Sequence, residues 1–397
     1  MKHNYLLTVI VPTRNRQKYA LKCIEYILSL KLNIQLIVCD NSDNRSLEEN
    51  VKAFETDPCF KYVYISQRIA CVDNYETAAS LAEGEYFCAI GDDDTILPNI
   101  INVTLWMKKN NIDAVKSSVF LNYWWPQKDS NFLDRRKNGC VWCDKLAANT
   151  RSINTFDGVI KLLQNGGQDY LALDLIRSYH GIVKTSRLIE AKEKSGRFYG
   201  GCSPDIYSSV SLSLLPNIKC YEIGIPFTLP GVCSQSTSSD SEKGKHAGDL
   251  ETAPQFVGMV KPYDWDEIIP KYYTVQTIWA ETAITAVKNM GYEWMLSKYF
   301  NREKLIEEMI KKNPAHKEKI ERIVLADGMH ISFNKETPKK NNKKKVFNRI
   351  RRLLNIIINR VLFRLNCPSI ENGASLVNSF LNNYRNRKIV RKVFDDK

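Results

Sequence analysis

Short apolar runs alternate with helical patterns over the first hundred residues of this 397-residue chain. Residues 6–12 and 34–39 are apolar and rich in β-branched side chains, which is typical of strands buried on both faces of a parallel sheet. Residues 62–65 and 86–90 give two further strands, and helical spacing precedes the second and the fourth. This order predicts an α/β fold with an open sheet, in which ligands bind beyond the carboxyl ends of the strands.

Three consecutive carboxylates, Asp92, Asp93 and Asp94, follow the fourth predicted strand. Adjacent like charges raise one another's pKa, so a site that keeps all three ionised usually holds a cation. Carboxylates bind Mg²⁺ or Mn²⁺ together with the phosphoryl oxygens of a nucleotide diphosphate. Asp40 ends the second strand at the same edge, where an acidic side chain can accept hydrogen bonds from a ribose or a base. The pattern therefore predicts a metal-dependent nucleotide site.

The positive charge of the chain is concentrated in one segment. The net charge is +13, and residues 335–364 contain eleven Lys or Arg against one Glu. With 44% hydrophobic residues the rest of the chain can form a sizeable core. We therefore expect a nearly neutral globular body with a basic appendage.

Apolar residues recur at three- and four-residue spacing over 346–365, with Arg and Asn between them. This pattern predicts an amphipathic helix that, with the lysines upstream, binds an anionic membrane surface through residues 339–365. The alternatives are packing on the body or on a second subunit in a homodimer. The tail has no interleaved stacking aromatics, so we expect no nucleic acid partner.

Eleven cysteines are scattered along the chain, an odd number, and many lie within apolar runs. They are predicted to be free thiols in a reducing compartment. Cys140 and Cys143 form one CxxC pair, but no second pair follows at the spacing of a structural zinc site. No secretory signal and no apolar run of about 20 residues is present. We expect a cytoplasmic protein, peripheral on the inner face of the cell membrane.

Weaker patterns organise the rest of the chain. A helix is predicted over 99–109, a strand over 113–121 and an irregular aromatic region over 123–160, whose Tyr123-Trp124-Trp125 stretch would stack on a sugar or pack in the core. Further predictions are a strand over 178–183, a helix over 206–214, a mobile loop over 231–248 that is either a lid or a plain connection, and helices over 264–325.

Four stretches, residues 8–15, 36–42, 73–86 and 91–98, together resemble glycosyltransferase family 2. The resemblance implies the inverting GT-A fold, which is a Rossmann-like, mixed, mostly parallel sheet flanked by helices, here with a helical C-terminal extension. It also implies work on a bacterial surface polysaccharide such as capsule or O-antigen. The resemblance is strong over residues 5–100 and thinner over 178–215.

The resemblance assigns roles to particular residues. The opening Pro-Thr segment and the aspartate after the second strand would hold the nucleoside, and the acidic triplet would hold metal and diphosphate, with Asp93 the most direct ligand. A late histidine, His246, is the candidate additional metal ligand. The nucleotide-binding residues implied or suggested in this way are Pro12, Thr13, Arg14, Asp40, Arg68, Asn74 and Asp92, with a structural cap as the alternative for Arg68 and Asn74; the metal ligands are Asp93, Asp94 and His246.

The catalytic base of this family lies about a hundred residues beyond the metal motif. Asp205, at the start of a predicted helix, resembles it, although Ser203 and Pro204 replace the usual acidic neighbour. Asp169 and Asp174 remain competitors. A carboxylate there would deprotonate the acceptor hydroxyl.

These expectations divide the chain into four parts. Residues 1–122 would be the half that binds the nucleotide sugar, 123–260 the half with the acceptor and the base, 261–335 a helical extension and 336–397 the basic amphipathic tail. The predicted activity is transfer of a sugar, with inversion, from a nucleotide-diphosphate donor to a glycan or lipid-linked acceptor. The alternatives are a nucleotidyltransferase acting on sugar phosphates and a non-catalytic assembly protein at the membrane.

Overall fold

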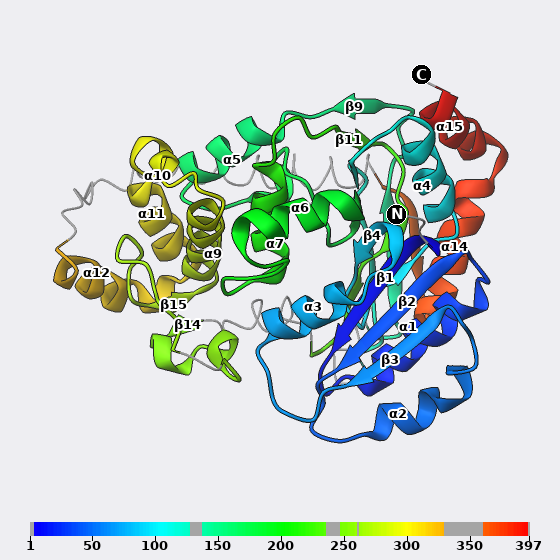
Figure 1. Ribbon diagram of the computed structural model, residues 1–397, viewed down its shortest axis with the longest axis horizontal. Helices are drawn as coiled ribbons and strands as arrows, with labels where there is room; N and C mark the ends of the chain where they lie inside the picture. Colours follow the sequence, from blue (N-terminus) through cyan, green and yellow to red (C-terminus); the bar gives the residue numbers. More distant parts are fainter. Residues whose placement is uncertain (1–3, 128–136, 236–246, 260–261, 329–359, 396–397) are drawn as a thin grey trace.

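The computed structural model describes residues 4–127, 137–235, 247–259, 262–328 and 360–395. Figure 1 shows a sheet of parallel strands at one end and a group of helices, α9 to α12, at the other. Within the described residues the large sheet has eight strands, in the spatial order β3 (Phe60–Tyr64), β2 (Ile34–Asp40), β1 (Tyr5–Thr13), β4 (Gly84–Ala89), β10 (Gly181–Lys184), β6 (Ala114–Ser117), β11 (Cys220–Ile223) and β9 (Thr150–Ser152).

The sheet is mixed and mostly parallel. Strands β3, β2, β1 and β4 are parallel, β10 runs antiparallel to both β4 and β6, and β11 pairs parallel with β6. The predicted architecture of a mostly parallel sheet flanked by helices is thus confirmed.

Alternate residues of β1 enter different cores. Val9 and Val11 face the helices α1 (Gln17–Ser29), α2 (Ser46–Val51) and α4 (Ile100–Lys109). Ile10 faces the other side. The helices packed there, or continuing that side of the molecule, are α3 (Cys71–Ser80), α5 (Thr155–Gln164), α6 (Thr185–Ser195), α7 (Pro204–Ser213), α9 (Val275–Asn289), α10 (Trp294–Tyr299), α11 (Arg302–Lys312) and α12 (Lys317–Ala326). Burial on both faces explains why β1 is apolar throughout.

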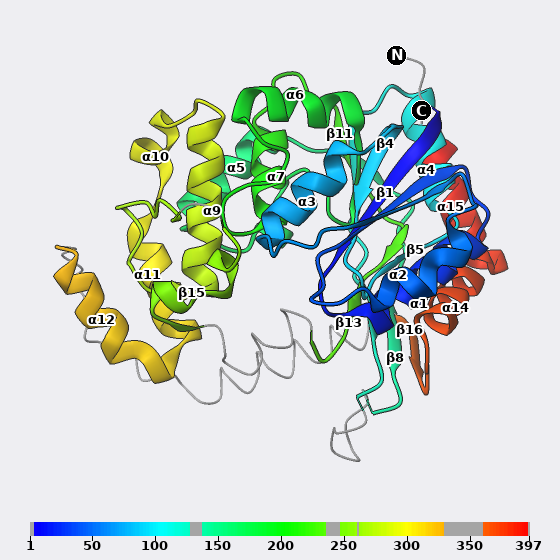
Figure 2. The same cartoon turned by 60° about the horizontal axis from the view of Figure 1, so that its bottom comes forward.

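Smaller sheets complete the fold. Strand β5 (Thr95–Ile96) pairs with β12 (Thr228–Leu229), and β14 (Ala247–Gly248) pairs with β15 (Tyr273–Thr274). A third sheet has the order β13 (Gly231–Val232), β7 (Leu121–Trp124), β8 (Cys140–Asp144) and β16 (Arg360–Leu365). In Figure 2 strands β8 and β16 extend away from the main sheet. Short 3₁₀ turns occur at Lys52–Phe54, Tyr170–Ala172, Leu250–Thr252, Pro254–Phe256 and Pro314–His316.

Several local predictions were wrong. The strand predicted over 113–121 is two strands, β6 and β7, which lie in different sheets. The region predicted to be irregular contains β8, β9 and α5, where Asn154 caps the helix by accepting a hydrogen bond from the backbone N–H of Asp157 at 3.2 Å. Three apolar side chains of α5 then enter the core with helical spacing.

The amphipathic helix predicted over 346–365 is wrong for its last six residues, because Arg360–Leu365 is strand β16, antiparallel to β8. Residues 329–359, and with them most of the predicted membrane segment, lie outside the described residues. The chain then forms α14 (Ile370–Asn382) and α15 (Tyr384–Asp395). Figure 1 shows both beside α4 and α1, at the end of the molecule opposite the helices α9 to α12.

The start of the predicted mobile loop is a strand, because Gly231 and Val232 pair with β7. Residues 236–246 lie outside the described residues. None of the eleven cysteines, all of which lie in the described ranges, forms a disulfide. Among the helices that the structure describes, none is long and apolar enough to cross a bilayer.

Candidate active site

Three predicted site residues meet at the carboxyl edge of the parallel strands. Thr13 lies opposite Asp40 in the register of β1 and β2, and β4 leads to Asp92 on the other side of β1. The Thr13 Oγ1 hydroxyl donates a hydrogen bond to Asp92 Oδ2 at 2.6 Å. All three side chains are buried. The convergence follows from the topology, since parallel strands end at one edge of the sheet.

Asp40 is held by two donors. Its carboxylate accepts a hydrogen bond from the backbone N–H of Ser42 at 2.8 Å and another from the Tyr62 hydroxyl at 2.8 Å. Burial and the hydrogen bond to this carboxylate raise the pKa of Tyr62 well above its usual range, so the phenol keeps its proton and remains a donor. Asp40 is thus fixed in orientation at the strand end.

The other predicted nucleotide residues lie around this edge. Asn74 on α3 donates hydrogen bonds to the carbonyl oxygens of Thr13 and Cys39, both at 3.2 Å, while its own Oδ1 is buried without a hydrogen-bond partner. Pro12 is buried in β1. Arg14 forms an ion pair with Asp43, with Nη2 to Oδ1 at 2.5 Å.

Arg68 is exposed in the loop between β3 and α3. Sequence reasoning did not single out Asn41, which connects this loop to the end of β2. The Asn41 side chain donates to the carbonyl oxygen of Gln67 at 2.7 Å and accepts from the backbone N–H of Ile69 at 3.1 Å. The loop that carries Arg68 is therefore attached to the strand edge.

Arg16 is the cation that contacts the acidic triplet. Its Nε donates to Asp92 Oδ2 at 3.1 Å, its Nη2 lies 2.5 Å from Asp92 Oδ1, and its Nη1 lies 3.5 Å from Asp93 Oδ1. Burial disfavours the charge, but the two carboxylates outweigh it and raise the pKa of Arg16. From the sequence, Arg16 was a hint only of the triphosphate loop of the alternative nucleotidyltransferase, and its contact with the triplet was not predicted.

Asp93 is the least compensated member of the triplet. One carboxylate oxygen accepts a hydrogen bond from the backbone N–H of Cys233 at 3.1 Å, and its carbonyl oxygen accepts one from Trp125 Nε1 at 2.8 Å. Burial, and next the negative charge of Asp94, raise the pKa of Asp93 to about 7. A carboxyl group that titrates near neutral pH is typical of a functional site.

Asp94 accepts four hydrogen bonds from protein groups. The donors are the backbone N–H groups of Gly91 and Gly231, both at 2.6 Å, the Tyr179 hydroxyl at 2.8 Å and His180 Nε2 at 3.0 Å. Burial opposes ionisation, but His180 and the other donors outweigh it and lower the pKa of Asp94. Asp94 thus joins the end of β4 to β10 and β13.

Only a glycine fits at position 231. A Cβ atom there would lie 1.7 Å from the carbonyl oxygen of Asp93. This close approach of β13 brings the Gly231 and Cys233 N–H groups to the triplet. The single sequence gave no signal for this contact, because 137 residues separate Gly231 from Asp94.

Asp205 lies in the first turn of α7, where the helix N-terminus favours a negative charge. Its carboxylate accepts hydrogen bonds from the buried Tyr170 hydroxyl and from Ser203 Oγ. Helix α3 packs against β1, which ends at Thr13, and against α7, whose first turn holds Asp205.

The competing carboxylates have different surroundings. Asp174 forms an ion pair with Arg151, with both N–O distances 2.7 Å, and this pairing lowers its pKa. Asp169 is exposed in a left-handed backbone conformation with φ 59°, and it accepts a hydrogen bond from Asn165 at 3.2 Å. His246 lies outside the described residues. Among the described side chains, no three of His, Cys, Asp or Glu are arranged to surround a metal ion.

Residues 8–134 match the model of the family described as glycosyl transferase family 2. The matched residues, called the family 2 region below, make up about a third of the chain. This region contains Thr13, Asp40 and the triplet, whereas Asp205 lies beyond it. The family 2 region therefore contains the candidate nucleotide and metal residues and ends before the candidate base.

Two curated relatives match part of the chain. A protein of Escherichia coli K12 named as a colanic acid biosynthesis glycosyl transferase, WcaA, is 34% identical over 114 residues, 28% of this chain and 40% of that protein. Glycosyltransferase GlyG of Streptococcus pneumoniae serotype 4 is 29% identical over 130 residues, 32% of this chain and 42% of that protein. The chain thus spans less than half the length of each relative it matches.

Among solved structures, S. aureus TarS residues 1–349 in complex with UDP-GlcNAc gives a TM-score of 0.45 at 12% identity, covering 94% of this chain and 91% of that one. The same TarS fragment with UDP gives a TM-score of 0.39.

Proposed function

We propose that this protein is an inverting glycosyltransferase that moves one sugar from a nucleotide-diphosphate donor to a glycan or lipid-linked acceptor. The observation that carries the proposal is the convergence of Thr13, Asp40 and the Asp92–Asp94 triplet at one sheet edge, all within the family 2 region. In open α/β sheets this edge is where nucleotides bind.

The nucleoside would bind between the ends of β1 and β2. Asp40 accepts hydrogen bonds there in a fixed orientation, and Pro12 and Thr13 form the adjacent backbone. Arg14 and Arg68 lie near the edge as cations for the donor phosphates. The unpartnered Oδ1 of Asn74 is an acceptor available to a ribose hydroxyl.

Asp92 and Asp93 offer two buried carboxylates to a divalent cation, Mn²⁺ or Mg²⁺. Three buried carboxylates are compensated by Arg16 and by His180, and the raised pKa of Asp93 marks the remaining excess of negative charge. Asp93, with Asp92, would hold the ion, whose chemistry is to stabilise the charge of the leaving diphosphate. The role predicted for Asp94 stays a prediction, and its four protein donors favour a structural part. The role of His246 also stays a prediction.

Asp205 is proposed as the general base. Its carboxylate would take the proton of the acceptor hydroxyl while that oxygen attacks the anomeric carbon, and the bond from this carbon to the diphosphate oxygen breaks. Attack opposite the leaving group inverts the configuration, with no covalent enzyme intermediate. Tyr170 and Ser203 would orient the carboxylate. Asp174 is the weaker candidate for the general base, because it forms an ion pair with Arg151.

The implied pathway is assembly of a surface polysaccharide, since one relative is named for colanic acid biosynthesis. Lipid-linked precursors of such polymers would place the protein at the cytoplasmic face of the membrane, held through residues 339–365. A second subunit remains the alternative partner of that segment.

The two other activities are less well supported. A nucleotidyltransferase would need several free basic residues near the N-terminus for a triphosphate, whereas Arg16 forms an ion pair with the buried Asp92. A non-catalytic assembly protein would leave the acidic triplet without a role.

The test is hydrolysis and transfer with a panel of uridine, guanosine, thymidine and cytidine diphosphate sugars, with and without Mn²⁺. We expect one donor to release its nucleoside diphosphate, and both Asp93→Asn and Asp205→Asn to lower the rate at least about a hundredfold. Asp174→Asn is the matched control and should retain the rate. Release of pyrophosphate would indicate a nucleotidyltransferase. No turnover with any donor would refute the proposal that the protein is an enzyme.

A further inference from the structure

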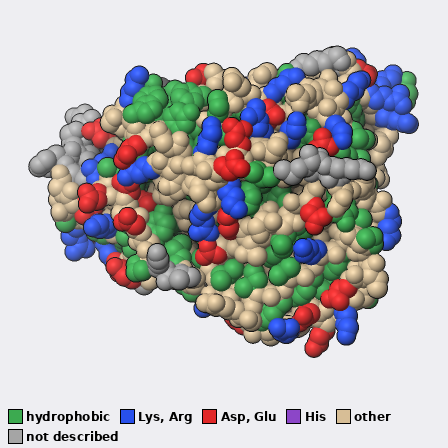
Figure 3. Space-filling model, in the orientation of Figure 1, with side chains coloured by type: hydrophobic (Ala, Val, Ile, Leu, Met, Phe, Trp, Pro, Cys, Tyr) green, Lys and Arg blue, Asp and Glu red, His purple; other side chains and the backbone are tan. Residues whose placement is uncertain are grey.

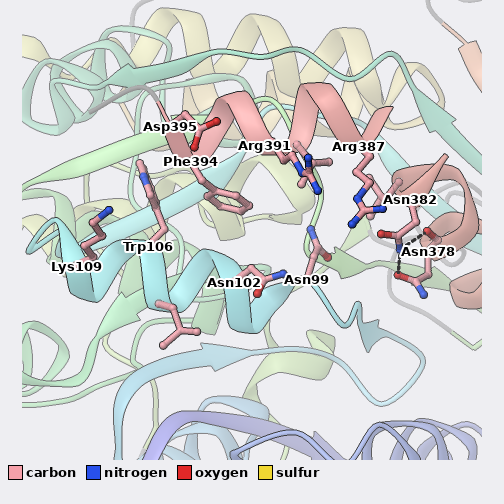
Figure 4. A pocket seen from close by; sticks show the side chains of 13 residues that line it. Asn99, Asn102, Trp106, Lys109, Asn378, Asn382, Arg387, Arg391, Phe394 and Asp395 are labelled. Atoms are coloured by element: carbon pink, nitrogen blue, oxygen red, sulfur yellow. Dashed lines mark hydrogen bonds between the residues drawn. The ribbon is translucent and has the colours of Figure 1, made fainter. Parts of the chain in front are cut away.

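A groove far from the candidate active site lies between α4 and α15, with α14 at one end. Its volume is about 540 Å³. Figure 4 shows Asn102 and Trp106 of α4 on one side and Arg387 and Arg391 of α15 on the other, with the arginine side chains directed toward α4. Nothing in the proposed transfer reaction uses this groove.

The groove has a firm apolar floor. Trp106 and Phe394 pack with ring centroids 6.3 Å apart. Trp106 is only 5% exposed, yet its indole N–H is buried without a hydrogen-bond partner among the described residues. Helix α15 is anchored there, because Val393 is fully buried and its carbonyl oxygen accepts a hydrogen bond from Thr150 Oγ1 at 3.2 Å. The groove is thus a formed feature of the fold.

Three cations line the groove without a carboxylate partner in the described part of the chain: Lys109, Arg387 and Arg391. The neighbouring Lys108 differs, since its Nζ lies 2.5 Å from Glu85 Oε2. Asp395 also lines the groove, but no ion pair joins it to these cations. In Figure 4 Arg387 and Arg391 lie side by side, and Lys109 lies toward the other end, beyond Trp106. Like charges without compensation in one groove favour the binding of an anion.

Neutral donors complete the lining. The side chains of Asn102 and Asn378 both face the groove, and neither amide nitrogen donates a hydrogen bond within the described residues. Figure 3 shows Lys and Arg side chains gathered over α15, at the upper right of that view. The groove therefore combines guanidinium and ammonium groups, amide donors and an aromatic floor.

We propose that this groove binds the phosphate group of a ligand that also carries an organic portion. Guanidinium groups match the oxygens of a phosphate with paired N–H donors, and three cations suit a group of charge up to −2. The Trp106 and Phe394 floor would contact the organic portion. The phosphate comes either from a free phosphorylated metabolite or from the headgroup of an anionic lipid, which have the same chemistry at this groove.

The experiment uses two probes on the full-length protein. Glycerol 1-phosphate is titrated by calorimetry at low ionic strength, and vesicles of phosphatidylglycerol or of phosphatidylcholine are tested by co-sedimentation. The variant is Arg387→Gln with Arg391→Gln. The matched control is Arg385→Gln with Lys392→Gln, which removes the same charge from exposed residues of α15 outside the groove.

We expect the groove variant to weaken binding at least about tenfold and the control less than about twofold, because only the former removes charge-assisted contacts. Binding of glycerol 1-phosphate would assign a free ligand, and binding of phosphatidylglycerol vesicles alone would assign a headgroup. Failure of wild type to bind either probe, or an equal loss in both variants, would overturn the proposal. If the double variant has a lower melting temperature than wild type, Lys109→Gln on α4 replaces it as the test. This variant must then weaken probe binding by about threefold.

Discussion

The Arg16 guanidinium lies against the Asp92 carboxylate at the base of the acidic triplet, with Nη2 2.5 Å from Oδ1 and Nε donating to Oδ2 at 3.1 Å. Asp92 is fully buried and Arg16 only partly exposed. Removing the cation from a buried ion pair strongly destabilises the folded state, because the carboxylate left behind carries an uncompensated charge. Arg16 is also in competition with any metal ion that uses Asp92 or Asp93.

Replacing Arg16 should therefore separate these two effects. Arg16→Gln in EDTA should lower the free energy of unfolding at pH 7 by about 3 kcal/mol. Mn²⁺ should raise the melting temperature of the variant more than that of wild type, because the ion then replaces the lost charge. Differential scanning calorimetry with and without Mn²⁺ measures both.

Arg14→Gln is the control, because its partner Asp43 is 65% exposed and such pairs contribute at most about 1 kcal/mol. Equal melting temperatures for Arg16→Gln and wild type in EDTA would contradict the compensating role of Arg16.

The neighbouring aspartates should respond differently to amidation. Asp94→Asn should lower stability by about 3 kcal/mol, because the new amide nitrogen faces groups that donate to Asp94. Asp93→Asn should leave stability unchanged or raise it, because it removes a buried charge next to Asp94. Urea unfolding at pH 7 compares the two. A larger loss in Asp93→Asn than in Asp94→Asn would show that their roles are reversed.

The strands of the first half could be predicted because each one is marked by its own local sequence. Strands β1, β2 and β4 are buried on both faces, so most of their residues are apolar, and β1 and β2 end in the polar residues Thr13 and Asp40. Once three parallel strands are recognised, Thr13, Asp40 and Asp92 must meet at one edge. That part of the candidate site needed no side-chain detail.

The remaining contacts depend on loop geometry and on distant segments. Arg16 reaches the triplet from a turn in which Asn15 has φ 54°, a conformation that the surrounding sequence does not specify. Gly231 and Cys233 arrive through pairing of β13 with β7. No periodic pattern in a single sequence records such a pairing.

Strand β16 shows how a pattern can support two structures. Its apolar residues fit the helical spacing of the preceding segment, but they also fit strand alternation, with Leu362 buried and Phe363 packed on Trp142 at 6.4 Å. Backbone hydrogen bonds with the edge of β8 stabilise the strand rather than the helix. Tertiary context of this kind overrides local propensity.

Two tyrosines that donate to site carboxylates should affect different kinetic constants. Tyr170→Phe removes a donor to Asp205 and should lower kcat about tenfold with little change in KM, because it misplaces the proposed base. Tyr62→Phe removes a donor to Asp40 and should raise KM for the donor sugar a few-fold with little change in kcat. Steady-state kinetics on the active donor provides the comparison, and the opposite division between kcat and KM would exclude these placements.

A buried carboxyl group outside the site should control the pH dependence of stability. Glu281 on α9 is 1% exposed, and burial raises its pKa to about 7, although hydrogen bonds from Asp266 N–H and from Tyr263 and Thr285 act in the opposite direction. The ordinary pKa of an unfolded Glu is about 4.3. Between these values the folded state binds more protons than the unfolded state, so the free energy of unfolding falls as the pH rises from about 4 to about 7.

Glu281→Gln should reduce this dependence, and Asp93, whose pKa is also raised to about 7, should account for what remains. The amide oxygen can still accept the hydrogen bond from the Asp266 N–H, but the side chain no longer ionises. Two to three pKa units at about 1.4 kcal/mol each set an upper limit of roughly 4 kcal/mol for the stabilisation at pH 8. Thermal unfolding from pH 5 to pH 8 measures it, with Glu293→Gln at the exposed end of the same region as control. A variant whose melting temperature follows the wild-type pH profile would show that Glu281 stays ionised in the folded protein.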